Sequence, residues 1–166
     1  MHPVTQSAIV TLTAVSAVAF SHVVAGQSSI RWERYSEHLR ARHRHVSAFD
    51  AARGETLVFG GLHQHPLAVG LFGFRDSRWR RRDAGQTWPG QRSGSAMAYD
   101  LRRQVVVMVG GLADNLWIDD TWEWNGSRWT RRQPVNRPPA GDNHRMAFDA
   151  RRGRLVLFHG SMGTRE

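Results

Sequence analysis

The sequence predicts an all-β protein built from repeated four-stranded antiparallel sheets. Three observations carry this prediction: a segment that recurs three times at a spacing near fifty residues, a continuous apolar run inside each copy, and tight-turn signals around the runs. The chain has 166 residues, among them 16 Gly and seven Trp, but no Cys. The lack of Cys excludes disulfides, thiol catalysis and cysteine-built zinc sites.

The first thirty residues carry no charged side chain, and residues 8–20 are an apolar stretch. This length suits the core of a signal peptide better than a membrane span, which needs about 20 strongly apolar residues. We therefore expect residues 1–26 to be a signal peptide cleaved after Gly26, with no lipid anchor, and the mature protein to be secreted or periplasmic. Because His2 is the only candidate cation before the apolar stretch, a misplaced start codon or a buried strand is the alternative.

The repeat is visible as three segments that align without internal gaps. These are residues 48–61, 98–111 and 147–160. Tyr99 lies 50 positions after Phe49, and Phe148 lies 49 positions after Tyr99. Trp79 and Trp129 are also 50 positions apart, each within an identical Ser-Arg-Trp. This shared register predicts three copies of one structural unit.

Each copy begins with two predicted strands joined by a turn. The first strand ends in an aromatic–Asp pair, whose Asp can accept hydrogen bonds from the turn amides, while Gly54 or Gly153 takes a positive φ. The second strand is the apolar run, for example residues 105–109, and such a run suits a strand buried on both faces. It stops at Gly60-Gly61 and Gly110-Gly111, where the backbone passes close to a neighbour or turns sharply.

Two further strands complete the unit. The third is clearest at residues 120–124 (Asp-Thr-Trp-Glu-Trp), where Trp122 and Trp124 alternate onto one face. Asn125-Gly126 then marks a hairpin turn into a fourth strand that carries Trp129. In the preceding copy, the third strand corresponds to residues 71–74, and Pro- and Gly-rich links separate the copies.

Four antiparallel strands at a period near fifty match the blade of a β-propeller. The residues resemble the kelch family, and the aromatic-Asp-x-x-Arg-Gly segment resembles bacterial kelch and galactose-oxidase-like propellers; the resemblance covers residues 31–160. The positions that match the kelch pattern are Gly60, Gly61, Trp79, Gly110, Gly111, Asp120, Trp122, Trp124, Trp129 and Gly160. In two departures, His159 replaces the first Gly of the third copy, and Gly70 stands where the second copy has Asp120.

The expected organisation is an incomplete propeller ring. Residues 45–82 and 94–132 form complete blades, residues 143–166 form the first half of a third, and residues 27–44 form a tail in which Trp32 matches the last strand of a preceding blade. Propellers close with about 4–8 blades. We therefore expect either a fragment of a longer reading frame or a chain that self-associates through its open blade edges.

The net charge is +9, and all 23 basic residues are Arg. The Arg pairs recur at matching points of the repeat, so we interpret them first as turn and strand-end residues; the lack of Lys is also typical of a GC-rich genome. Specific nucleic-acid binding is not expected, because no recognition motif is present. Nonspecific binding to nucleic acid or other polyanions is an alternative function, and its affinity would fall steeply with salt.

Two histidine pairs, His43 with His45 and His63 with His65, have a spacing that could bind a metal if a carboxylate joined them. No acidic residue is adjacent and neighbouring Arg repels a cation, so we predict surface loops and no metal or cofactor. His45 and His144 each precede an aromatic–Asp strand, and this repeated placement favours a structural role.

No catalytic residue is predicted. Galactose oxidase requires copper ligands that include a Cys-linked Tyr, so its activity is not implied for a chain with only two Tyr and no Cys. Asp119, Asp120 and Glu123 are the only acidic cluster, and we interpret Asp120 as a turn cap rather than a calcium ligand or acid catalyst. Phosphate-binding loops and Ser-His-Asp patterns are also lacking in the sequence.

The resemblance implies a non-catalytic interaction scaffold that binds a protein or glycan ligand through the loops at residues 62–70 and 112–119. We expect the repeated Trp residues in the core. Trp88 and Trp117 have no counterpart in the neighbouring copy and are the candidates for exposed binding contacts. The alternative is the propeller part of an exported oxidase or carbohydrate-active enzyme, with its active site in other blades.

Overall fold

The computed structural model describes residues 18–19, 33–34, 39, 41–62, 69–83 and 87–162. The predicted signal peptide lies outside these residues except for β1 (Val18–Ala19), which pairs with β2 (Glu33–Arg34). Trp32 and the pair His63 and His65 also lie outside them. Every regular element of the described chain is a strand, which confirms the all-β prediction, and none of the described residues belongs to a helix that could span a membrane.

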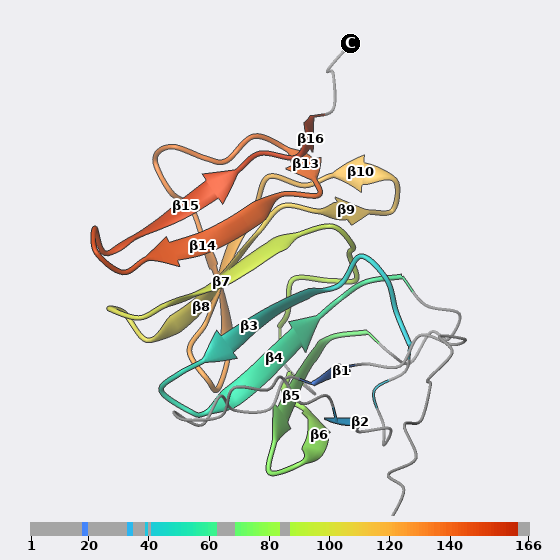
Figure 1. Ribbon diagram of the computed structural model, residues 1–166. Coiled ribbons are helices and arrows are strands. Elements are labelled where there is room, and N and C mark those ends of the chain that lie inside the picture. The colour runs from blue at the N-terminus through green and yellow to red at the C-terminus, as the bar shows by residue number, and fades with distance from the viewer. Residues whose placement is uncertain are drawn as a thin grey trace, which may run out of the picture.

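The first complete sheet is antiparallel throughout and has the order β3-β4-β5-β6 (Figure 1). Its strands are β3 (Val46–Asp50), β4 (Glu55–Phe59), β5 (Leu71–Arg75) and β6 (Arg78–Arg81). In the turn after β3, Asp50 Oδ1 accepts a hydrogen bond from the Arg53 amide at 3.2 Å, and Gly54 has φ 61°. This is the turn chemistry that the aromatic–Asp pattern predicts.

The second sheet repeats this order as β7-β8-β11-β12. Its strands are β7 (Ala96–Asp100), β8 (Val105–Val109), β11 (Thr121–Trp124) and β12 (Trp129–Arg132). A small hairpin of β9 (Leu112–Ala113) and β10 (Leu116–Trp117) interrupts the connection from β8 to β11. The side chain of Asn125 accepts hydrogen bonds from the amides of Ser127 and Arg128, which closes the predicted turn between β11 and β12.

The third copy consists of two paired strands, β14 (Arg145–Asp149) and β15 (Arg154–Phe158). Asp149 repeats the turn contact, because its Oδ1 accepts a hydrogen bond from the Arg152 amide at 2.9 Å. Beside this hairpin, β13 (Gly141–Asp142) pairs with β16 (Ser161–Met162).

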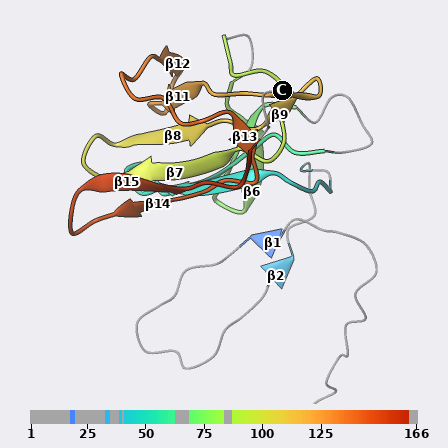
Figure 2. The same ribbon diagram turned by 90° about the horizontal axis from the view of Figure 1, so that it is seen from above.

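The three copies stack through their first strands, so that β3, β7 and β14 lie side by side (Figures 1 and 2). Two apolar cores lie between neighbouring copies. The first joins both complete sheets and includes Leu57, Phe59, Leu71, Val106, Met108, Trp122, Trp124 and Trp129. The second joins the second sheet to the hairpin and includes Ala96, Val107, Val109, Met146, Leu155 and Leu157. Burial of this apolar area is the main favourable contribution to stacking.

The two cores use the same positions of the repeat. Val107 and Val109, which face the third copy, are each 4% exposed. They correspond to Leu57 and Phe59 in the first copy, which are 0% and 1% exposed and face the second copy. The corresponding residues of the third copy, Val156 and Phe158, are 51% and 75% exposed. The hairpin therefore presents to solvent the same face that the other two copies bury.

Candidate ligand-binding site

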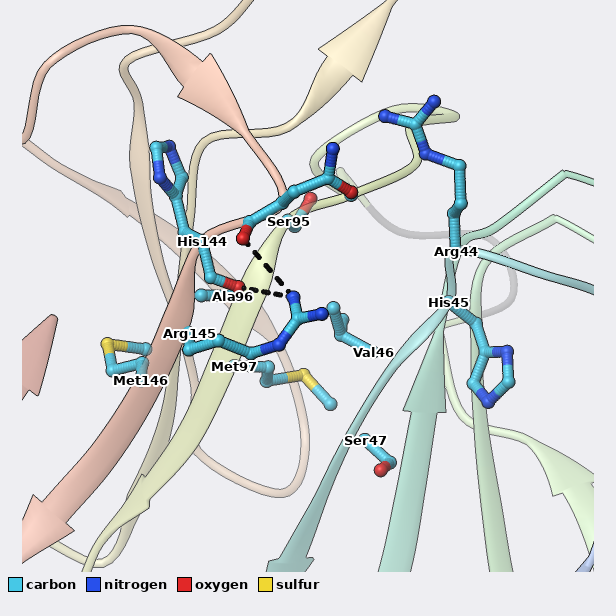
Figure 3. A pocket seen from close by; sticks show the side chains of 12 residues that line it. Arg44, His45, Val46, Ser47, Ser95, Ala96, Met97, His144, Arg145 and Met146 are labelled. Atoms are coloured by element: carbon cyan, nitrogen blue, oxygen red, sulfur yellow. Dashed lines mark hydrogen bonds between the residues drawn. The ribbon is translucent and has the colours of Figure 1, made fainter. Parts of the chain in front are cut away.

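A pocket of about 460 Å³ opens where the first strands of the three copies, β3, β7 and β14, begin (Figure 3). Each copy of the repeat contributes four consecutive lining residues, and these are residues 44–47, 94–97 and 143–146. The three segments occupy the same repeat positions, since they are 50 and 49 residues apart. The pocket is thus a product of the repeat, and it forms only where the copies stack.

A backbone ladder between the copies forms one edge of the pocket. Arg44, Gly94 and Asn143 stand at one repeat position and have φ values of 56°, 67° and 57°. The Gly94 amide donates a hydrogen bond to Arg44 O at 2.9 Å, and the Asn143 amide donates one to Gly94 O at 2.7 Å. Only one of these three residues is Gly, so the sequence alone gives little sign of this left-handed position.

The paired glycines mark the close backbone approach between copies. The amide of Gly61 donates to Arg92 O at 2.9 Å, and the amide of Gly111 donates to Gly141 O at the same distance. A Cβ added at Gly60 would lie 2.4 Å from Arg92 O. In the third copy, the Gly160 amide instead donates to the ring of His144 at 3.0 Å.

Arg145 supplies the cation that faces the pocket, and its side chain extends from the start of β14 toward Val46 in the view of Figure 3. Its Nη1 donates hydrogen bonds to the carbonyl oxygens of Asn143 and His144, at 3.2 and 3.0 Å. Among the described residues, Nε and Nη2 of Arg145 have no hydrogen-bond partner and the guanidinium has no ion pair. Arg44 differs, because it is paired with Asp142.

Two histidines of the lining are held in the neutral form. His144 is 1% exposed, and its ring lies 4.6 Å from that of His159, centroid to centroid. Burial, followed by the His159 charge, lowers the pKa of His144. Desolvation and the charge of Arg42 lower the pKa of His45. No group of three or more His, Asp or Glu that could hold a metal occurs in the described part of the chain.

The acidic cluster at residues 119–123 is engaged by arginine. Asp120 accepts hydrogen bonds from the guanidinium of Arg92 and from Trp122 Nε1, the latter at 2.7 Å. Glu123 accepts hydrogen bonds from the guanidinium groups of Arg103 and Arg132, the latter at 2.7 Å. These contacts tie strands and links together, so both carboxylates act as structural partners of Arg.

Sequence reasoning missed the buried arginines that precede the first strands of the first two copies. Arg42 and Arg92 are 6% and 5% exposed, and each donates to the carbonyl of the first Gly of its own copy, Gly60 or Gly110, at 3.2 Å. The signal was present in the sequence, because Arg42 and Arg92 are 50 positions apart. In the third copy this position is Gly141.

The two candidate contact tryptophans lie in different environments. Trp88 is half-buried, packs against the first core, and has its ring 6.2 Å from that of Phe59. Trp117 is 44% exposed on β10, next to the exposed Leu116. The repeated residues Trp79, Trp122, Trp124 and Trp129 are all buried.

The loops expected to bind a ligand begin at the same end of the sheets as the pocket. His43 pairs with Leu62, and Ser93 pairs with Leu112, just before the lining segments 44–47 and 94–97. The hairpin of β9 and β10, which carries Trp117, belongs to the second of these loops. Most of the first loop lies outside the described residues.

Compared with known proteins, the chain matches no family model and no curated protein.

Proposed function

We propose that this protein is a non-catalytic kelch-type scaffold, composed of β-propeller blades, that binds a protein or glycan ligand at the pocket end of its sheets. The observation that carries the proposal is the convergence of equivalent residues from all three copies on one concave pocket. Binding sites are typically concave and sit where structural units meet. Export from the cytoplasm is part of the proposal and rests on the charge-free, apolar N-terminal sequence.

The blade assignment is supported by strand order and by stacking. Both four-stranded sheets run antiparallel in chain order, their first strands lie side by side, and the apolar runs of β4 and β8 are buried. A radial stack of such sheets is the architecture of a propeller.

A binding rather than a catalytic role is supported by the state of the carboxylates near the pocket end. Asp120 is engaged by Arg92, and Asp142 is paired with Arg44. A general acid or base needs a titratable group that can reach the substrate. The arrangement instead offers hydrogen-bond donors, an exposed Trp117 and a concave surface, which suit recognition.

The test is selection of ligands from a peptide display library and a glycan array with the full chain, followed by two substitutions. Trp117→Ser alters the pocket end, and Leu101→Ser is the matched control, because Leu101 is 54% exposed in the turn at the opposite end of β7. We expect the selected ligands to lose at least about tenfold in affinity with Trp117→Ser and to be unaffected by Leu101→Ser. Equal effects of the two substitutions, or no selected ligand, would contradict the proposal.

We further propose that the exposed face of the β14–β15 hairpin is a second interaction surface and that it binds a second copy of this chain. This face continues the established interfaces, since Val156 and Phe158 match the residues that the first two copies of the repeat bury against a neighbouring copy. The first copy offers Phe49, which is 49% exposed on the opposite face of its sheet. Such a head-to-tail contact can close into a ring or extend as a filament.

A further inference from the structure

We propose that Arg145 forms a carboxylate-binding subsite in the pocket, so that the ligand carries a carboxylate group. This inference rests on the proposed function, because it assigns a ligand chemistry to the same pocket. It concerns a residue that departs from the repeat: Arg145 stands where the other copies have Ala96 and Val46.

The guanidinium of Arg145 is oriented by the protein and still has free donors. Arginine has five N–H donors, and the contacts from Nη1 to Asn143 O and His144 O fix one side of the group. Nε and Nη2 are left without partners among the described residues. These two nitrogens form the edge that binds a carboxylate through two parallel hydrogen bonds.

The electrostatic balance of the pocket favours an anion. No Asp or Glu is among the lining residues, Arg44 is neutralised by Asp142, and the lowered pKa values of His45 and His144 keep their rings neutral at pH 7. The charge of Arg145 is therefore not compensated within the lining. Arg145 is itself exposed, so its affinity for an anion depends on its oriented donors as well as on its charge.

The remaining lining suits a ligand with an apolar part beside its carboxylate. Ser47 is a polar member of the lining, while Val46, Met97 and Met146 contribute apolar surface. The hydroxyl of Ser95 is buried and donates to Gly110 O at 2.9 Å, so it binds the protein backbone. No Phe, Tyr or Trp lines the pocket, so the subsite offers none of these rings for stacking on a sugar.

The experiment measures binding of fluorescein-labelled hexaglutamate to the full chain by fluorescence anisotropy, with hexaglutamine as the uncharged probe. The variants are Arg145→Gln and the matched control Arg78→Gln, which lowers the net charge equally at an exposed position of β6. We expect Arg145→Gln to weaken hexaglutamate binding about tenfold to a hundredfold, as for loss of a hydrogen-bonded ion pair. Arg78→Gln should change it less than about twofold, since Arg78 is exposed like Arg145 but does not line the pocket.

Unlabelled glutarate, added as competitor, identifies what carries the carboxylate. Displacement that depends on Arg145 supports a free small carboxylate as the ligand, whereas binding of hexaglutamate without displacement by glutarate supports a carboxylate on a polypeptide. Arg145→Lys tests the two-point contact and should recover only part of the affinity, because Lys binds as a point charge. Thermal unfolding of each variant checks that the fold is retained.

Equal losses with Arg145→Gln and Arg78→Gln, or equal binding of hexaglutamine, would overturn the subsite and favour nonspecific binding of polyanions. So would the absence of hexaglutamate and glutarate binding. If Trp117→Ser abolishes binding of a selected ligand while Arg145→Gln does not, the binding face stands and only the carboxylate subsite fails.

Discussion

Asp83 directs its carboxylate into the space that Gly70 leaves open: a Cβ added at Gly70 would lie 2.7 Å from Asp83 Oδ1. The buried carboxylate accepts hydrogen bonds from the Leu71 amide at 2.9 Å and from Arg81 Nε at 3.2 Å. In the second sheet, Asp120 occupies the Gly70 position. The first sheet thus keeps a carboxylate beside the start of β5, but this carboxylate belongs to Asp83, which follows β6. This explains the departure at Gly70.

Removing this carboxylate leaves a buried amide and an arginine without their partner. We expect Asp83→Ala to lower the free energy of unfolding by about 1–3 kcal/mol, measured by urea denaturation. Asp76→Asn is the control, because the Asp76 side chain is 81% exposed and Asn tolerates its positive φ of 52°, and it should change stability by less than about 0.5 kcal/mol. Similar effects of the two substitutions would contradict the structural role of Asp83.

A second carboxylate also comes from different strands in the two sheets, and this difference can be tested by exchanging its position. Glu55 in β4 binds Arg82 at 2.9 Å, and a Cβ added at Gly73 would lie 2.0 Å from Glu55 Oε1. In the second sheet, the Gly73 position is Glu123, which binds Arg132, the counterpart of Arg82.

We therefore expect Gly73→Glu alone to be strongly destabilising, because it places two acidic side chains in one buried space. The double variant Glu55→Val with Gly73→Glu reproduces the second sheet, where Val105 matches Glu55. It should recover most of the loss, giving a coupling free energy of about 1–3 kcal/mol in a double-mutant cycle. Additive effects would show that the two sheets do not share this arrangement.

The ion pair between Arg92 and Asp120 is the most buried one described, with side chains 4% and 8% exposed. We expect Asp120→Ala to destabilise the protein by about 3–5 kcal/mol, because it leaves the guanidinium buried without its counter-ion. Asp119→Ala, at the neighbouring position, should have a much smaller effect. Near-equal unfolding midpoints for the two variants would count against this account of Asp120.

Stability should also fall on mild acidification. Because burial and His159 lower the pKa of His144, the unfolded chain binds a proton below about pH 6.5 that the folded chain does not bind. Stability is then lost as pH falls from 7 to 5, with up to about 1.4 kcal/mol per pH unit from this residue. His144→Gln should show a shallower pH dependence. The lowered pKa of Asp100 acts only below its usual value of 3.8, outside this range. An unchanged slope in His144→Gln would contradict the assignment.

The exposed hairpin face predicts concentration-dependent self-association. Light scattering after size exclusion should give a molar mass above that of one chain, and Phe158→Arg should shift it toward the monomer, because Phe158 is 75% exposed at a position that the other copies bury. Leu101→Arg, which places a charge on an exposed turn, is the control. A wild-type chain that stays monomeric at all concentrations would rule out the second copy as partner.

Local patterns allowed the strands and turns to be predicted from the sequence. The Asp of each aromatic–Asp pair contacts amides only two or three residues away, so spacing along the chain was enough. The relocated carboxylates were not predictable in this way, because Glu55 meets Gly73 only once β4 and β5 pair. Arg145 was not singled out from the sequence, since its place in a pocket depends on the stacking of three segments.

The central claim is that ligands bind at one end of the stacked sheets. Hydrogen exchange with and without a ligand selected from the peptide library or glycan array tests it most directly, because the pocket and the opposite turns lie on the same strands. The account predicts slower exchange at residues 44–47, 94–97 and 143–146, with no change in the turns at 51–54, 101–104 and 150–153. Protection at those turns, or none at the pocket, would contradict it.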